Sequence, residues 1–454
     1  MKLRMATGAI LAGAVFLTGC QTTDQEGSES QSSIIESSSI ESSGMESQSS
    51  EEQVTDNQLK EGSAEEANMD EETLAEIDQI VEAAMEEKII PGAVVFIAKD
   101  NTIVKETAYG YAQKFDMGEE LSEPIEMTTD TVFDLASVTK VMATTQGIMK
   151  LVSEGEISVD DQVAMYVPDF SKNGKEEVTI ADLLTHTSGL TPWEPTYLTA
   201  KNREEVLDYI NDLPLEYETG TDRKYSDFSF MMLAFILESI TDKRLDEYLQ
   251  DEIYGPLQME DTLFNAAENT EQPIAATSWG NPYEYKMIED DEFGYTVPED
   301  PEMFDGWREY TLVGEINDGN GFYANEGIAG HAGLFSTAKD LAVLGQTMLN
   351  GGTYGDVELY SQEVLQTFTS PQRFDQGYGW ELNKEWYMGD QHSDQTFGHT
   401  GFTGTQVIFD PEYNVQIIIL TNKQNNGQKE DGSYASTGQL SQDISNKVYE
   451  SIKK

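Results

Sequence analysis

Cysteine is almost absent from this chain of 454 residues, which contains a single one, Cys20. One cysteine excludes an internal disulfide framework and any zinc or iron–sulfur site that needs several thiolates. Basic residues are also scarce, because 27 lysines and arginines stand against 84 aspartates and glutamates and give a formal net charge of −57. Most of such a surface repels nucleic-acid phosphates, so we expect no nucleic-acid partner.

The first apolar stretch, Met5–Phe16, is too short to span a membrane in the mature protein. Two basic residues precede it and Leu17-Thr18-Gly19-Cys20 follows, which predicts a signal peptide over residues 1–19. This ending resembles the bacterial lipobox, whose cysteine is diacylated and becomes the first residue of the mature protein. The resemblance implies lipidation at Cys20 and an extracytoplasmic domain anchored to the bacterial cell membrane. An ordinary secretory signal with a chance cysteine is the alternative.

The next segment is rich in serine and acidic residues. Twelve of the 23 residues from Ser28 to Ser50 are serine, and the 20 acidic residues between Asp24 and Glu87 are accompanied by one lysine, Lys60. This composition cannot bury enough apolar surface to offset the entropy of ordering. We therefore predict the lipidated cysteine plus a disordered spacer over residues 20–70, and one folded domain over 71–454. A docking tail for a basic partner is the alternative.

Apolar periodicity predicts regular structure at both ends of that domain. Leu74, Ile77, Ile80, Val81, Ala84 and Met85 have helical spacing, as do Leu440, Ile444, Val448 and Ile452 near the C-terminus. Residues 93–104 and 405–420 each predict a hairpin of half-buried strands, and mostly helical sequence lies between. The order predicts an α/β fold of the α+β type: an antiparallel sheet built from both chain ends, flanked by helices, with an inserted and mainly helical subdomain.

The first motif with chemical potential is Ser137-Val138-Thr139-Lys140. The apolar pattern after it is helical, so Ser137 and Lys140 lie one turn apart on one face at a helix start. A serine becomes nucleophilic when a nearby base takes its proton, and a helix N-terminus offers N–H groups to a developing oxyanion. Taken alone, the spacing also fits an ordinary helix cap.

Two further motifs follow in the chain. Tyr225-Ser226-Asp227 precedes an apolar helix over 228–240, and His399-Thr400-Gly401 stands at the start of the last hairpin, where a glycine permits close approach of a ligand to the backbone. In this order the three motifs resemble those of the serine β-lactamase and penicillin-binding protein superfamily.

Supporting stretches at 183–190, 329–338 and 398–422 are similar to class C β-lactamase-like serine hydrolases. This group includes low-molecular-mass penicillin-binding proteins, D-aminopeptidases, D-alanyl esterases and family VIII carboxylesterases. Residues 307–338 most resemble lipoprotein-like relatives of penicillin-binding protein 4B. The resemblance covers about residues 72–452, nearly the whole predicted domain.

The resemblance implies a role for each motif residue. Ser137 would be the acyl-forming nucleophile, Lys140 its proton acceptor, and Tyr225 the acid or base for the leaving group and later for water. The backbone N–H groups of Ser137 and Phe402 would form the oxyanion hole. The implied substrate-binding residues are Asp227, His399, Thr400 and Gly401. No cofactor and no metal are implied.

Two positions depart from the β-lactamase pattern: Asp227 replaces an asparagine and His399 replaces a lysine. An ionised Asp227 can only accept hydrogen bonds and favours the ammonium form of Lys140, so Tyr225 would carry more of the base role. A histidine with an ordinary pKa of about 6.5 is mostly neutral above that pH, and so anchors a carboxylate less well than lysine. Both changes count against efficient β-lactam hydrolysis and resemble esterase and peptidase members.

Weaker candidates remain. We interpret His186 as a structural turn histidine, and we leave open whether His331 lines the pocket or only packs. Asp318 and Asn320 are expected in a solvated loop rather than in a calcium site, because their spacing fits no EF-hand. Residues 255–335 are predicted to be a loop-rich insertion near the pocket, with an acidic part at 281–326.

Together these features predict a serine hydrolase that acts through a serine acyl-enzyme on D-amino-acid amide or ester bonds of the cell envelope, as a D-alanyl carboxypeptidase or esterase. Its expected partners are an envelope peptide or a small ester or amide, and the membrane through the lipid on Cys20. A small-substrate carboxylesterase or β-lactamase is one alternative. A catalytically idle binding or sensor lipoprotein is the other.

Overall fold

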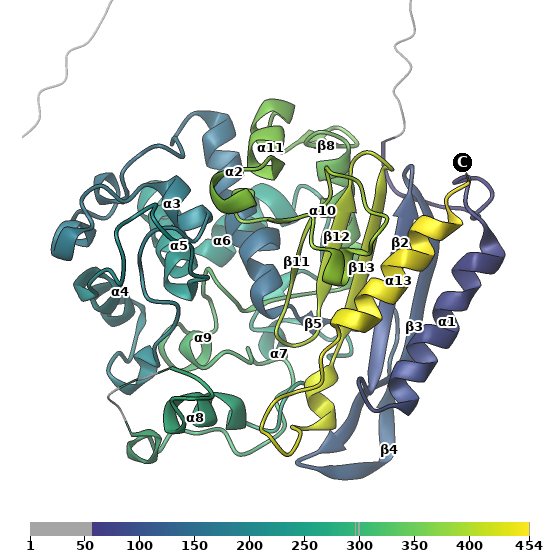
Figure 1. The fold of residues 1–454 in the computed structure, drawn as a ribbon, viewed down its shortest axis with the longest axis horizontal. Helices are drawn as coiled ribbons and strands as arrows, with labels where there is room; N and C mark the ends of the chain where they lie inside the picture. The colour runs from purple at the N-terminus through teal and green to yellow at the C-terminus, as the bar shows by residue number, and fades with distance from the viewer. Residues whose placement is uncertain (1–56, 296, 298–299, 454) are drawn as a thin grey trace, which may run out of the picture. The chain divides into compact units, whose positions relative to one another are not determined.

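The computed structural model describes residues 57–295, 297 and 300–453. Its centre is an eight-stranded sheet made from both ends of the described chain (Figure 1). The strand order is β1-β3-β2-β13-β12-β11-β10, with β4 also paired to β3, and within this sheet only β1 and β3 run parallel. The predicted fold class is confirmed. The strands are β1 Lys60–Glu61, β2 Gly92–Lys99, β3 Thr102–Asp116, β4 Glu119–Glu126, β10 Glu381–Leu382, β11 Phe397–Thr400, β12 Gln406–Asp410 and β13 Val415–Thr421.

Both predicted hairpins are present, but their burial differs from the prediction. Strands β2, β12 and β13 were predicted to be half buried, yet every residue in them is buried. The reason is that apolar side chains project from both faces of the sheet, and both faces are covered. Val95 and Ile97 belong to the core under the terminal helices, whereas Val94 and Phe96 belong to the larger core on the opposite face.

The terminal helices α1, Glu71–Glu86, and α13, Gly438–Ser451, lie side by side on one face of the sheet (Figure 1). Both follow the predicted apolar spacing, and Ile77 and Val448 are fully buried in their shared core. The side chain of Asp70 caps α1 by accepting from the N–H of Thr73. These two helices cover one face of the sheet, so the candidate catalytic residues lie on the other side of it.

The opposite face carries α10, Ala338–Leu349, and a mainly helical lobe. The centre of that lobe is α5, Asp227–Thr241, which is buried from Phe228 to Leu237. The other helices of eight or more residues are α2 Thr145–Glu154, α4 Arg203–Asp212, α8 Pro282–Glu289 and α11 Gln362–Thr369. Shorter ones are α3 Ile180–Leu184, α6 Leu245–Leu249, α7 Ala266–Asn269, α9 Gly319–Ala324 and α12 Glu385–Met388. A small sheet of β5 Phe133–Asp134, β7 Leu334–Ser336 and β6 Leu263–Phe264, and the hairpin β8 Thr353–Tyr354 with β9 Val357–Glu358, complete the fold.

The folded part begins earlier than the sequence predicts. Lys60 and Glu61 pair with β3, and Met69 is fully buried and bridges Ile452 at the C-terminus. The spacer predicted for 20–70 is therefore wrong over residues 57–70, where a few apolar side chains make contacts that an average over the segment hides. The signal peptide, Cys20 and the rest of the spacer lie outside the described residues.

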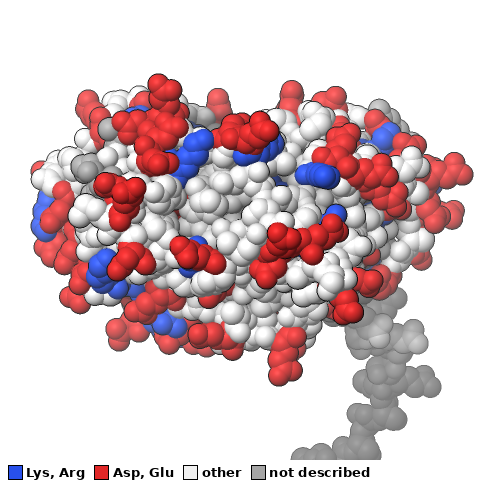
Figure 2. All heavy atoms as spheres, turned by 90° about the horizontal axis from the view of Figure 1, so that it is seen from below, with Lys and Arg blue, Asp and Glu red and all other residues white. Residues whose placement is uncertain are grey.

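The surface of the domain is strongly acidic. On the face shown in Figure 2, acidic side chains outnumber basic ones and lie around a broad uncharged area. Among the described residues, the structure contains no helix that is both long and apolar enough to cross a bilayer.

Candidate active site

Ser137 lies in an irregular helical turn directly after β5. A 3₁₀ turn, Ala136–Val138, leads into a π-helical turn, Lys140–Thr144, and regular α-helix begins only at Thr145. Ala136 has a φ of 45°, which is uncommon outside glycine, and its N–H donates to Oδ1 of Asp134 over 2.8 Å. The other oxygen of Asp134 accepts from the N–H of Asn317 over 2.6 Å. One buried carboxylate thus fixes both the turn before Ser137 and a segment of the opposite pocket wall.

Lys140 is fully buried beside Ser137 and meets three acceptors. Its Nζ lies 3.1 Å from Oγ of Ser137, 2.9 Å from the carbonyl oxygen of His331 and 2.8 Å from Oδ1 of Asp227. Burial disfavours the ammonium, but the charge of Asp227 and the neighbouring Tyr225 outweigh burial and raise the pKa of Lys140. The resting site therefore holds Lys140 as an ammonium, as the replacement of asparagine by Asp227 led us to expect.

Tyr225 lies two residues before α5, whose first turn is capped by Ser226. The Nζ of Lys140 is 4.8 Å from the centroid of the Tyr225 ring. Burial raises the pKa of Tyr225, and attraction to Lys140 opposes that rise only in part. The phenol is therefore protonated near neutral pH and is available as a proton donor.

His186 contacts the ring of Tyr225 and the backbone of the next residue. Its Nδ1 accepts from the N–H of Ser226 over 3.0 Å, and its ring lies 4.4 Å from the ring of Tyr225. Its φ of 59° places it in a left-handed turn, in agreement with the structural interpretation. Burial, helped by nearby cations, lowers the pKa of His186 well below its usual range and keeps the ring neutral. This residue therefore orients Tyr225 through the backbone and through ring contact.

The third motif, His399-Thr400-Gly401, begins in strand β11 of the sheet and lies close to Tyr225. His399 lies in β11, 6.0 Å from the ring of Tyr225, and its Nδ1 donates to the carbonyl oxygen of Thr400 over 2.8 Å. Burial, the largest influence, lowers its pKa, so His399 is neutral near pH 7. A side chain at Gly401 would collide with the carbonyl of Leu135, which explains the glycine. Phe402 follows and faces the pocket.

These elements surround a pocket of about 440 Å³. Its lining residues are Ala136, Ser137, Trp193, Tyr225, Asp227, Tyr283, Glu284, Met287, Phe293, Gly294, Tyr295, Asn317, Asp318, His331, Ala332 and Phe402. The structure thus brings Ser137, Tyr225, Asp227 and Phe402 to one cavity, with Lys140 beneath Ser137. Half of the lining comes from the acidic insertion over 281–326, so that insertion forms a pocket wall.

The sequence analysis missed most of this wall. Trp193, Tyr283, Glu284 and Tyr295 were not singled out, and the one signal for them was the density of aromatic residues within the acidic insertion. The burial of Glu284, together with repulsion from Asp318, raises its pKa to about 8, so most Glu284 side chains are protonated at neutral pH. Its Oε1 accepts from the N–H of Gly319 over 2.6 Å.

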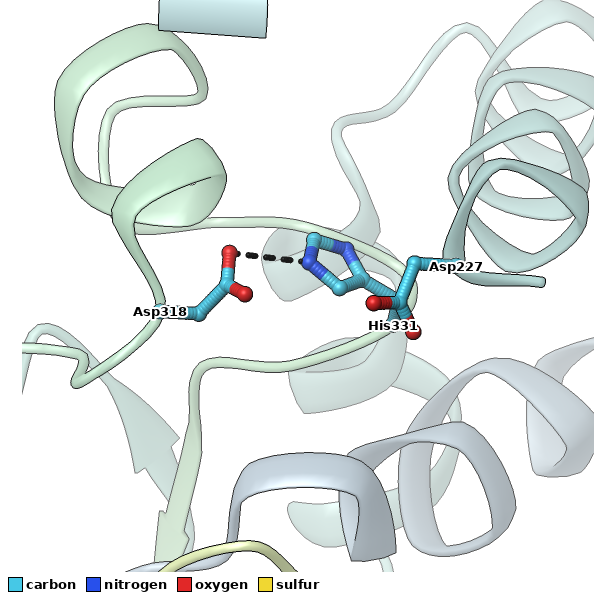
Figure 3. A group of neighbouring side chains, drawn as sticks. All are labelled: Asp227, Asp318 and His331. Carbon is cyan, nitrogen blue, oxygen red and sulfur yellow. Dashed lines mark hydrogen bonds and ion pairs between the residues drawn. The ribbon is translucent and has the colours of Figure 1, made fainter. Parts of the chain in front are cut away.

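Asp318 and Asn320 are not in a solvated loop, contrary to the prediction. Asn320 is fully buried and accepts from the hydroxyl of Thr196 over 2.7 Å. Asp318 caps α9, and its Oδ1 lies 2.9 Å from Nε2 of His331 (Figure 3). Hydrogen bonds hold both side chains in the domain: Asn320 is buried, and Asp318 is partly exposed at the pocket. His331, for which two roles were open, both lines the pocket and accepts from Lys140 through its carbonyl.

Asp227, Asp318 and His331 are the described side chains whose ligand atoms could converge on a metal ion, since these atoms lie within 4.8 Å of one another. Figure 3 shows the ring of His331 with the two carboxylates on either side of it. Asp227 is already paired with Lys140, and Asp318 with His331. We therefore assign the three residues to the hydrogen-bond network of the pocket rather than to a metal site.

Known proteins are similar to this chain in sequence and in fold. The family model described as Beta-lactamase matches residues 77–439. A protein of Bacillus subtilis named N-acetylmuramyl-L-alanine amidase is 38% identical over 373 residues, which cover 77% of this chain and 81% of that protein. An Escherichia coli protein named "Putative D-alanyl-D-alanine carboxypeptidase" is 39% identical over 355 residues, 73% of this chain and 78% of that protein. The solved structure of a penicillin-binding protein homologue from Caulobacter crescentus has a TM-score of 0.61 at 19% identity and covers 84% of this chain and 97% of its own.

Proposed function

The chain belongs to the Beta-lactamase family and is a serine hydrolase, and from this premise we propose that it cleaves amide or ester bonds of the bacterial cell envelope through an acyl-enzyme on Ser137. One observation carries the proposal: Oγ of Ser137 lies 3.1 Å from Nζ of the buried Lys140 and opens onto a pocket of about 440 Å³. The proximity of a serine hydroxyl, a lysine amine and space for a substrate supports the proposal.

The first half-reaction acylates the enzyme. A neutral Lys140 takes the hydroxyl proton as Oγ of Ser137 attacks the substrate carbonyl carbon. The backbone N–H groups of Ser137 and Phe402 stabilise the oxyanion. Tyr225 donates a proton to the leaving nitrogen or oxygen, whose bond to carbon then breaks and leaves an ester on Ser137. Because Asp227 favours the ammonium of Lys140, the rate rises with pH as the neutral amine becomes more abundant.

The second half-reaction hydrolyses that ester. Water gives a proton to the phenolate of Tyr225 as it attacks the acyl carbon, and Ser137 leaves with the proton held by Lys140. The products are a carboxylic acid and an amine or alcohol. Ser137, Tyr225 and a neutral Lys140 are regenerated, and Lys140 then takes up a proton to return to its resting ammonium form. His186 contributes by holding Tyr225 in place throughout.

Two amide bonds of the envelope are suggested by the names of the relatives. One joins an N-acetylmuramyl group to L-alanine, and the other joins two D-alanines. A small neutral ester is a second candidate substrate class, because His399 is neutral and the described lining of the pocket contains no lysine or arginine that would hold a substrate carboxylate.

The location is part of the same proposal. The lipobox-like Leu17-Thr18-Gly19-Cys20 supports lipidation on Cys20 and attachment outside the cytoplasm, where envelope bonds are accessible. Residues 21–56 would then tether the domain to the bilayer.

Covalent labelling tests the proposal directly. A fluorescent fluorophosphonate or penicillin should label the mature chain and should fail to label Ser137→Ala. Turnover of a p-nitrophenyl ester, a chromogenic cephalosporin and a D-alanyl-D-alanine peptide then separates the enzyme from an idle binding protein. Equal labelling of both proteins would refute Ser137 as nucleophile, and labelling without any turnover would favour the idle binder.

A further inference from the structure

A second cavity lies outside the catalytic pocket, where the C-terminal end of α1 meets β3 and the loop that leads into α13. Its volume of about 600 Å³ exceeds the 440 Å³ of the catalytic pocket and is of the size that small-molecule sites usually have. Its lining comes from three chain segments, within 85–91, 111–115 and 426–436, and among the described residues it shares none with the catalytic pocket. Hydrolysis at Ser137 therefore gives this cavity no role.

The charge of the second cavity is opposite to that of the chain. Lys88, Lys114 and Lys429 line it, and Glu87 is the only acidic side chain in its described lining, although the chain has 84 acidic and 27 basic residues. We call this cavity the lysine pocket. Within the described residues Lys88 and Lys429 form no ion pair, and the pair of Lys114 with the exposed Glu120 is long, at 3.9 Å. The three ammonium groups thus keep most of their capacity to bind an anion.

Hydrogen bonds between the chain segments hold the walls of the lysine pocket together. Nδ2 of Asn426 donates to the carbonyl oxygen of Lys88 over 3.0 Å, and the N–H of Lys114 donates to Oδ1 of Asn425 over 2.9 Å. Helix α13 begins two residues after the lining ends at 436, and its N-cap residue, Thr437, makes no side-chain cap hydrogen bond. The positive end of this helix dipole adds to the charge of the lysines.

Much of the remaining lining is apolar. Met85, Ile89, Tyr111 and Phe115 are half-buried there, and Nζ of Lys114 lies 5.4 Å from the centroid of the Phe115 ring. A small inorganic anion would leave these apolar side chains uncovered, and a neutral apolar molecule would leave the ammonium groups without a partner. A ligand that satisfies the whole lining needs both an anionic and an apolar part.

We propose that the lysine pocket binds an organic anion with an apolar body, that is, a carboxylate or phosphate group carried on an acyl chain or a ring. The anionic oxygens accept from the lysine ammonium groups, and the apolar body covers the half-buried side chains of the lining. An anionic bilayer would be repelled by a chain of net charge −57, so the ligand enters the pocket as a single molecule. This site goes beyond the proposed hydrolytic function and does not depend on Ser137.

Three probes separate the contribution of charge from that of apolar surface. They are titrated by calorimetry into the chain of residues 21–454, which keeps the whole described domain and lacks only the signal segment and Cys20. Decanoate should bind. Decyltrimethylammonium has a chain of nearly the same length and the opposite charge, acetate has no chain, and each should bind about tenfold more weakly or worse. Equal affinity of decanoate and decyltrimethylammonium, or of decanoate and acetate, would overturn the proposal.

Lysine variants locate the binding site. Lys114→Gln and Lys429→Gln should each raise the Kd for decanoate about threefold to fivefold, as expected for a partly exposed ion pair, and the double variant should raise it about tenfold or more. Lys339→Gln removes an exposed lysine of α10 that does not line the pocket, and should leave the Kd unchanged. An unchanged Kd in a double variant with a wild-type melting temperature would refute the lysine pocket as the site.

Binding of decanoate in the catalytic pocket is the competing outcome. Protein whose Ser137 has reacted with a fluorophosphonate should bind decanoate with the wild-type Kd, because the two cavities share no described lining residue. Loss of binding after this reaction would place the ligand in the catalytic pocket and overturn the proposal. The lysine variants should keep the ester turnover of the wild type. If Ser137 does not react at all, the acyl-enzyme function fails, and the lysine variants still decide whether the lysine pocket binds the anion.

Discussion

Replacing Asp227 with asparagine should lower the pKa of Lys140, so that more of its amine is neutral and able to accept a proton near pH 7. The two side chains form an ion pair of 2.8 Å around a fully buried Nζ. At an effective dielectric constant of about 20, two unit charges at this distance attract by about 6 kcal/mol, part of which offsets the cost of burying the ammonium. Asparagine has nearly the same shape, so the variant removes the attraction and leaves the burial.

The expected consequence is a shift of the pH profile. An opposite charge in contact commonly changes a pKa by about 1 to 3 units, and the neutral fraction of an amine changes tenfold for each unit. Asp227→Asn should therefore move the acid limb of kcat/KM for a p-nitrophenyl ester by about 1 to 3 pH units toward lower pH. Activity near pH 7 should not collapse.

The free energy of unfolding should depend on pH in opposite directions in the wild type and in Asp227→Asn. In the wild type the raised pKa of Lys140 contributes stability below its unfolded-state pKa, and this contribution disappears as the pH rises through the folded-state value. In Asp227→Asn the unpaired ammonium is costly, so the variant should lose stability as the pH falls. Melting temperatures at pH 6 and pH 9 measure this difference.

A matched control isolates the ion pair. Asp222→Asn changes an exposed carboxylate five residues earlier. It should leave the pH profile of kcat/KM unchanged. An acid limb that stays in place in a folded Asp227→Asn variant would refute the assignment of Lys140 as the titrating base.

Other variants test the remaining parts of the site and the chain. Ser137→Ala should lower ester turnover on the order of 10³-fold or more with an unchanged melting temperature; near wild-type turnover in purified protein would assign the nucleophile elsewhere. His186→Asn keeps an acceptor for the N–H of Ser226 and tolerates a positive φ, so its kcat should exceed that of His186→Ala while KM changes little in both; equal kcat values would mean that this hydrogen bond does not position the tyrosine. His399→Lys adds a cation and should raise the ratio of cephalosporin to ester turnover about tenfold between pH 5.5 and 9; a constant ratio would place His399 away from the substrate carboxylate. Cys20→Ala should move the protein out of the membrane fraction of its host; membrane retention would contradict the anchor. Deletion of residues 21–56 should leave turnover within about threefold, because the residues that line the pocket all lie beyond residue 135; a large loss would contradict the tether.

The sequence by itself determined the features that depend on neighbours in the chain. Helical spacing identified α1 and α13, and apolar runs joined by polar turn residues identified the two hairpins of the sheet. The separation of three residues between Ser137 and Lys140 also fixed their contact, because one helical turn brings them together even where the turn is 3₁₀ or π. The aspartate at position 227 predicted the ammonium form of Lys140, because an ionised carboxylate favours a neighbouring cation.

Only the tertiary structure decided which distant residues share the pocket. Trp193 precedes Tyr283 by 90 positions and Tyr295 by 102 positions in the chain, and no local pattern links the three to Ser137. The contact of Asp318 with His331 and the burial of Met69 against the C-terminus likewise depend on chain segments that meet only after folding. Periodicity reports which face of an element is apolar, but not what covers it. The composition of a segment reports an average, and a few buried side chains are enough to order residues 57–70 against the rest of the domain.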